Sequence, residues 1–126
     1  MKKSIFTSFV TALLMSLSMV SFGQTNLPLD AFVNKMKSVG NAQVLDVRTP
    51  GEWASGKVAN AHLINIQDPE FKSKVTKLDK DKPVFIYCAV GGRSAQAAKI
   101  LTQNGFKQVY NLQGAGYPDL AKKGIK

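Results

Sequence analysis

The sequence has few of the residues that build disulfides, metal centres and redox pairs. Its 126 residues include one cysteine, Cys88, and one histidine, His62. A single cysteine excludes an intramolecular disulfide, a C-x-x-C redox pair and a cysteine-based zinc site. No histidines or carboxylates recur at the spacing of metal ligands, and no glycine-rich loop of the Walker type is present. We therefore expect neither a metal ion nor a cofactor.

Acidic residues are also scarce, because 8 Asp and Glu side chains stand against 17 Lys and Arg side chains, which gives a net charge of +9. A basic surface can attract nucleic acids, acidic membranes or small anions. The lysines are spread along the chain without a dense run, and few aromatic residues lie between them. We therefore expect no nucleic-acid partner, and we expect the charge to attract a small anionic substrate. The oligomeric state is not indicated.

The chain lacks an apolar run of the roughly 20 residues that cross a bilayer. Its N-terminus instead has Lys2 and Lys3, an apolar stretch over residues 5–20 that several Ser and Thr residues interrupt, and then Ser21-Phe22-Gly23. This order is typical of a cleaved secretory signal peptide, which we place at residues 1–23. We therefore expect a periplasmic or secreted protein with no stable membrane anchor.

Residues 24–126 have a length that suits one small α/β domain. Strands that alternate with helices predict a small parallel β-sheet flanked by helices on both faces. Thr49-Pro50-Gly51-Glu52 has the spacing of a capping box, with Pro50 at the first helical position. The predicted helices cover residues 29–39, a turn after Pro50, 71–78, 94–104 and 117–123, and the predicted strands cover residues 43–47, 62–66, 84–87 and 107–110.

The cysteine lies in the most informative segment of the chain. An apolar run over residues 84–87 delivers Cys88 to a turn that contains Gly91 and Gly92 and leads into a helical pattern. Ligands of open α/β sheets bind at the carboxyl ends of strands, and the N–H groups of such a turn favour an anion. A thiol in this position should have a lowered pKa and be reactive. The competing interpretation is a buried cysteine that only ends a core strand.

Three blocks of the sequence resemble the rhodanese-like sulfurtransferase family, in its order and at its spacing. Residues 88–94, Cys-Ala-Val-Gly-Gly-Arg-Ser, resemble the C-x-x-G-x-R-S active-site loop. Residues 46–58 resemble the family's D-V-R-x-x-x-E-aromatic signature and the G-[H/K]-[I/V] that follows it. Residues 110–115 are close to the N-L-x-G-G element near the end of the domain.

The resemblance implies a rhodanese-like fold over residues 24–126 and a sulfurtransferase that needs no cofactor. Cys88 would take a sulfane sulfur from a small anionic donor such as thiosulfate, hold it as a persulfide and pass it to a thiol or cyanide. Arg93 is expected to contact the anionic end of the donor, and Ser94 to cap the helix. The expected substrate-binding residues are Ala89, Val90, Gly91, Gly92, Arg93 and Ser94.

Asp46 and Arg48 match the D-x-R of the same family. They are candidates for ordering the cysteine loop or bordering the pocket, and a structural ion pair or turn cap is an equal alternative. The chain departs from the family's pattern where Lys57 replaces a frequent histidine and where residues 114–118 lack the usual tryptophan. These changes leave the donor and the acceptor undetermined.

Two other classes of function remain open. Phosphatases and arsenate reductases on a related fold typically have a C-x₅-R loop, whereas four residues separate Cys88 from Arg93. The shorter loop disfavours a tetrahedral oxyanion substrate. A non-enzymatic sulfur carrier would use the same loop to hold a persulfide for a partner, and the sequence does not distinguish it from an enzyme.

Overall fold

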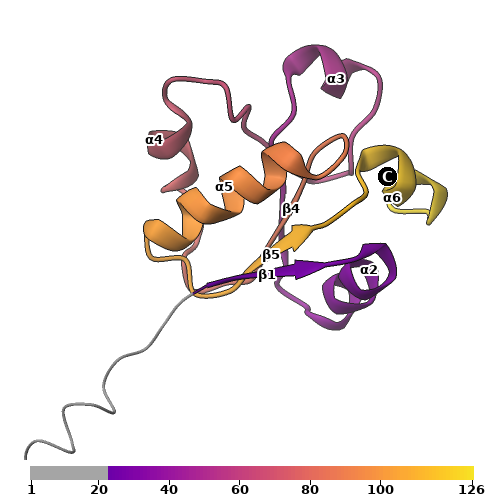
Figure 1. Cartoon of the computed structure of the whole chain (residues 1–126), viewed down its shortest axis with the longest axis horizontal. Helices are drawn as coiled ribbons and strands as arrows, with labels where there is room; N and C mark the ends of the chain where they lie inside the picture. The colour runs from indigo at the N-terminus through magenta and orange to yellow at the C-terminus, as the bar shows by residue number, and fades with distance from the viewer. Residues whose placement is uncertain (1–22) are drawn as a thin grey trace, which may run out of the picture.

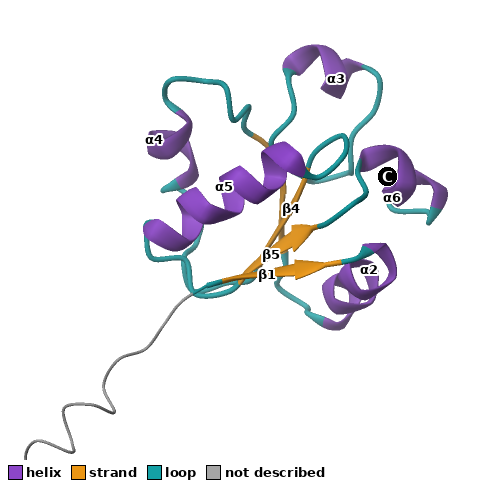
Figure 2. Ribbon diagram, viewed as in Figure 1, coloured by secondary structure: helices purple, strands orange, loops and turns teal. Residues whose placement is uncertain are grey.

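Strand β4 (Val84–Tyr87) forms the centre of a five-stranded parallel sheet in the computed structural model, which describes residues 23–126. Helices cover both faces of this sheet (Figures 1 and 2). The predicted fold class is therefore confirmed. The strand order is β1-β5-β4-β2-β3, and the other strands are β1 (Gln24–Leu27), β2 (Gln43–Asp46), β3 (His62–Leu63) and β5 (Val109–Leu112).

Two separate apolar cores lie on the two faces of the sheet. Helices α4 (Phe71–Val75) and α5 (Gly92–Gln103) supply the core on one face. Helices α2 (Leu29–Ser38) and α6 (Tyr117–Lys122) supply the core on the other. The short helix α3 (Pro50–Ala54) follows β2 and lies beyond the carboxyl ends of the strands (Figure 1).

The side chains of β4 alternate between these two cores, as a strand covered on both faces requires. Val84 and Ile86 face the same core as Cys88, whereas Phe85 and Tyr87 face the opposite core. All five are fully buried. Burial of an apolar side chain contributes about 1.5–3 kcal/mol, so β4 anchors firmly the residue that follows it, Cys88.

Helix α3 begins with the predicted capping box. The Thr49 hydroxyl accepts a hydrogen bond from the Glu52 N–H at 3.4 Å, and the Glu52 carboxylate accepts one from the Thr49 N–H at 3.2 Å. Pro50 occupies the first helical turn. The cap therefore fixes where the Glu52 carboxylate lies.

Several elements differ from the prediction. Strand β5 spans Val109–Leu112 and not residues 107–110, and helix α4 ends at Val75 and not at residue 78. Strand β1 was not expected, because Gln24–Leu27 carries one apolar residue and lies at the edge of the sheet, where little burial marks its pattern. Strand β3, at the other edge, spans only His62–Leu63 of the five residues predicted. Helix α5 begins at Gly92, two residues earlier than predicted.

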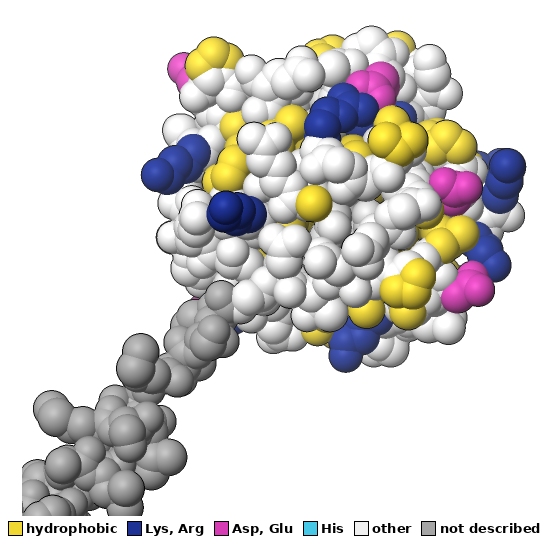
Figure 3. Space-filling model, in the orientation of Figure 1, with side chains coloured by type: hydrophobic (Ala, Val, Ile, Leu, Met, Phe, Trp, Pro, Cys, Tyr) yellow, Lys and Arg dark blue, Asp and Glu magenta, His cyan; other side chains and the backbone are white. Residues whose placement is uncertain are grey.

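The predicted signal peptide falls almost entirely on residues 1–22, outside the described residues, so cleavage and export stay predictions. In the described part of the chain, no helix has the length and apolar character needed to span a membrane. Lys and Arg side chains stand apart from one another on the face shown in Figure 3.

Candidate active site

Cys88 follows the last residue of β4, at the start of the loop that leads into α5. Figure 1 shows this loop between the two elements. The Cys88 Sγ atom accepts a hydrogen bond from the Gly91 N–H at 2.9 Å. Gly91 adopts a φ of 108°, which L side chains rarely reach, and a Cβ there would lie 3.1 Å from the Gly114 nitrogen. The turn that presents an N–H to the sulfur therefore requires glycine at this position.

The loop lowers the pKa of the Cys88 thiol below its ordinary value. Burial alone would raise that pKa, because a thiolate loses solvation inside the protein. Hydrogen bonds from the Ser94 hydroxyl and from the backbone N–H groups of Ser94, Gly91 and Val90 act in the opposite direction and outweigh it. The sulfur therefore meets the first requirement of a nucleophile, a stabilised thiolate.

Ser94 is not the helix cap that the sequence predicted. Gly91 occupies the N-cap of α5, and Ser94 lies within the first turn with its side chain buried. The Ser94 hydroxyl donates a hydrogen bond to the Gly91 carbonyl at 3.1 Å and lies 3.5 Å from the Cys88 sulfur. Because a hydroxyl rotates freely, it can turn its proton to the sulfur when the thiol ionises.

Replacing Ser94 with alanine should therefore raise the pKa of Cys88, because the thiolate loses one hydrogen-bond donor. The shift should be about one pKa unit, which corresponds to one ordinary hydrogen bond. The pH dependence of the alkylation rate of the single thiol measures it directly. A profile that does not move would show that the amides alone stabilise the thiolate. Ser94→Thr, which keeps the hydroxyl, is the matched control.

Arg93 lies in the first turn of α5, which is an unfavourable position for a cation, and its partner in the structure is a side chain of the protein itself. The two terminal nitrogens of Arg93 donate to the two carboxylate oxygens of Glu52 at 2.7 and 2.9 Å. The side chains of Arg93 and Glu52 are 28% and 31% exposed. An ion pair this accessible to solvent contributes roughly 0–1 kcal/mol, so it positions the two groups more than it stabilises the fold.

The ion pair keeps Glu52 charged. The hydrogen bond from Arg93 lowers the pKa of Glu52 to about 2, and the contacts with Thr49 support that shift. The pair also raises the pKa of Arg93, with a smaller contribution from the negative charge of Cys88. The sequence marks Glu52 as a capping residue and as the glutamate of the D-V-R-x-x-x-E block, but it does not indicate the contact with Arg93. The role of Arg93 as a donor ligand stays a prediction.

Asp46 and Arg48 form a buried ion pair, with 2.8 Å between Nη2 and Oδ2. The Asp46 carboxylate also accepts hydrogen bonds from the Tyr87 hydroxyl at 2.6 Å and from the Arg48 N–H at 3.0 Å. Arg48 donates to the Gly56 carbonyl at 2.7 Å, and its guanidinium lies over the Tyr117 ring. The network ties the end of β2 to Tyr87, the last residue of β4, which directly precedes the cysteine. Neither Asp46 nor Arg48 is within hydrogen-bonding distance of the Cys88 sulfur.

The segment from Gly114 to Tyr117 lies directly against the cysteine loop. The Tyr117 N–H donates to the Cys88 carbonyl at 2.9 Å. A Cβ on Gly116 would lie 1.8 Å from the Ala89 carbonyl oxygen and 2.5 Å from that of Cys88. Gly116 therefore allows a backbone-to-backbone contact that no other residue permits, and no local sequence pattern indicates this role.

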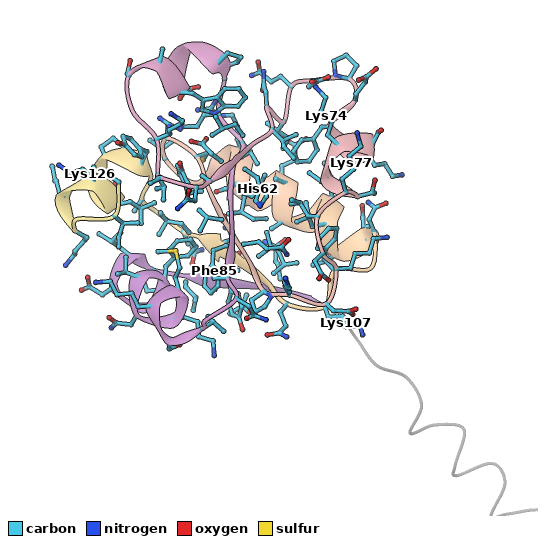
Figure 4. All side chains as sticks on the ribbon, turned by 180° about the vertical axis from the view of Figure 1, so that it is seen from behind. His62, Lys74, Lys77, Phe85, Lys107 and Lys126 are labelled. Carbon is cyan, nitrogen blue, oxygen red and sulfur yellow. The ribbon has the colours of Figure 1, made fainter. Side chains whose placement is uncertain are left out.

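Three other residues predicted to bind substrate lie on the cysteine loop, whereas His62 lies outside it. The Ala89 carbonyl lies against Gly116, Gly92 begins α5, and Val90 is 77% exposed. His62 lies on the edge strand β3 (Figure 4). Among the described residues, no three His, Cys, Asp or Glu side chains gather as metal ligands would.

The chain belongs to the rhodanese-like domain family, whose profile matches residues 30–121. A protein from Bacillus subtilis (strain 168), "Uncharacterized protein YqhL", is 40% identical over 73 residues, which are 58% of this chain and 56% of that protein. A protein named "Sulfurtransferase" from Allochromatium vinosum is 32% identical over 107 residues, covering 75% of this chain and 94% of that protein. "Thiosulfate sulfurtransferase GlpE" from Stutzerimonas stutzeri is 35% identical over 80 residues, 63% and 70% of the two chains.

Some relatives carry a different name and are much longer. The tRNA uridine(34) hydroxylase of Pelagibacter ubique is 35% identical over 104 residues, which cover 79% of this chain but 34% of that protein. Among solved structures, the rhodanese-related protein of Thermoplasma volcanium superposes with a TM-score of 0.66 at 31% identity, covering 81% of this chain and 95% of that one.

Proposed function

We propose that the protein is a sulfurtransferase that carries a sulfane sulfur on Cys88. The observation that supports this most directly is the Cys88 sulfur itself, which receives the Gly91 N–H at 2.9 Å in a turn that lowers the pKa of its thiol. The same turn can stabilise the terminal sulfur of a persulfide, because that sulfur also carries negative charge. Similarity to proteins named as sulfurtransferases supports the same function.

The proposed reaction has two half-reactions. In the first, the Cys88 thiolate attacks the outer sulfur of thiosulfate, an S–S bond forms, the S–S bond of thiosulfate breaks, and sulfite leaves with the electron pair. In the second, a thiophile such as cyanide or a thiolate attacks the terminal sulfur of the persulfide and regenerates the Cys88 thiolate. Neither half-reaction needs a cofactor or an external oxidant.

The range of donors and acceptors belongs to the proposal. Thiosulfate is a small anion, which the net charge of +9 would attract. One relative is also named as a thiosulfate sulfurtransferase. The relatives named tRNA uridine(34) hydroxylase share only about a quarter to a third of their length with this chain, and their hydroxylation is not proposed for it.

Steady-state kinetics with thiosulfate and cyanide tests the proposal. Because sulfite leaves before cyanide reacts, double-reciprocal plots at several cyanide concentrations should be parallel lines. Intersecting lines would contradict a free persulfide enzyme. A persulfide that forms once on Cys88 but is not turned over by cyanide or small thiols would favour the sulfur carrier. Hydrolysis of an aryl phosphate faster than sulfur transfer would favour the phosphatase alternative.

A further inference from the structure

The only charged side chain of the cysteine loop is already neutralised. Residues 89–94 are Ala, Val, Gly, Gly, Arg and Ser. Arg93 directs both terminal nitrogens of its guanidinium at the two oxygens of Glu52, at 2.7 and 2.9 Å. An anion that approaches the sulfur therefore meets a guanidinium whose two terminal nitrogens are both engaged, with a carboxylate beside it.

The neighbouring charges do not replace the one that is neutralised. Asp46 and Arg48 form their own buried pair, and both are satisfied within the Tyr87 network. The side chain that the loop presents to solvent is apolar, since Val90 is 77% exposed and is the large hydrophobic residue most open to solvent in the described chain. Backbone N–H groups and the Ser94 hydroxyl, which carry no net charge, supply the remaining polarity at Cys88.

Glu52 is held in this position independently of Arg93. It closes the capping box of α3 with Thr49, through the hydrogen bonds at 3.2 and 3.4 Å between backbone and side chain, and a third links the Thr49 hydroxyl to the carboxylate at 3.0 Å. A carboxylate fixed by a helix cap does not need to swing in to meet Arg93. An incoming dianion must either displace it or bind next to it, and both cost free energy.

From this geometry we infer that Glu52 determines donor specificity: by occupying Arg93 it disfavours the thiosulfate dianion and favours donors whose transferred sulfur is attached to an uncharged group, such as an organic hydropersulfide. The inference rests on the proposed sulfur transfer and concerns which donor supplies it. With a hydropersulfide, the Cys88 thiolate attacks the outer sulfur, the S–S bond of the donor breaks, and the donor leaves as a thiolate.

Glu52→Gln tests the inference with little disturbance of the fold. Glutamine serves in capping boxes as glutamate does, so α3 keeps its cap while the negative charge is removed. Asp81→Asn is the matched control, because it raises the net charge by the same amount. Asp81 pairs with Lys107 at 2.8 Å, and Lys107 lies near the start of the described chain, at the end of the sheet opposite Cys88 (Figure 4).

The measurement compares kcat/KM for thiosulfate with kcat/KM for the hydropersulfide of 2-mercaptoethanol, which carries no charge outside its sulfurs. Glu52→Gln should raise the value for thiosulfate about five- to tenfold, the effect of one charge at contact distance in water. The value for the hydropersulfide should change less than about twofold. Asp81→Asn should change neither. An unchanged or lower value for thiosulfate in Glu52→Gln would overturn the inference.

A binding experiment separates failure of this inference from failure of the proposed function. In a Cys88→Ser background, thiosulfate binds without reacting, and its Kd is measured by calorimetry with and without Glu52→Gln. Tightening by about five- to tenfold supports the role of Glu52 even if the wild-type protein transfers no sulfur. An unchanged Kd overturns that role even if sulfur transfer is robust.

Discussion

Replacing Cys88 with serine should abolish sulfur transfer while the protein remains folded. A serine hydroxyl is not ionised at neutral pH and cannot hold a transferable sulfur, so kcat/KM should fall by roughly a thousandfold or more. The serine oxygen can take the hydrogen bond from the Gly91 N–H that the sulfur now receives at 2.9 Å. The rate of thiocyanate formation from thiosulfate and cyanide measures the loss.

The control for this substitution is the thermal unfolding midpoint. Cys88 is fully buried, so a polar replacement will lower the midpoint by a few degrees at most if Ser94 and Gly91 satisfy the new hydroxyl. Turnover near the wild-type rate in a folded Cys88→Ser protein would remove the cysteine from the mechanism. If the Cys88→Ser protein does not fold, the same activity measurement is made on Cys88→Ala, which introduces no polar atom.

Replacing Gly116 with alanine should displace the cysteine loop. The added Cβ would lie 1.8 Å from the oxygen and 2.2 Å from the carbon of the Ala89 carbonyl. Both atoms belong to the backbone, so no change of rotamer relieves the overlap, and the loop or the segment before α6 must move. A displacement of about 1 Å at a reacting group costs on the order of a hundredfold in rate, which is the expected loss in kcat/KM.

Gly40→Ala is the matched control for Gly116→Ala, because nothing lies within 4 Å of a Cβ at position 40. It should leave both activity and thermal unfolding close to wild type. Gly116→Ala should also raise the pKa of Cys88, because the displaced turn no longer directs its N–H groups at the sulfur. Full activity and an unchanged alkylation profile would show that the loop tolerates a shift of this size.

The features that the sequence predicts well are those set by neighbours along the chain. The apolar run Val84–Tyr87 and the glycines after it predict both the buried strand and the turn that holds Cys88. The capping box at Thr49 is also local, because its two hydrogen bonds join residues three apart. The local sequence is therefore enough to place Cys88 after its strand and Thr49 and Glu52 at the start of their helix.

The features that the sequence did not predict depend on the packing of distant segments. Glu52 and Arg93 are 41 residues apart and meet only because parallel strands bring the loops after β2 and β4 to one edge of the sheet. Asp46 and Tyr87 meet for the same reason. Nothing in the local sequence distinguishes Gly116 from other glycines, because its role depends on the Ala89 carbonyl, which packs against it only in the folded structure.

Mass spectrometry of the purified protein after treatment with thiosulfate tests the central claim most directly. The account predicts a mass increase of one sulfur atom, located by fragmentation on the peptide that contains Cys88, and its removal by cyanide with thiocyanate as the product. The Cys88→Ser protein should show no increase. Absence of the added sulfur on wild-type protein, or its presence on Cys88→Ser, would contradict the account.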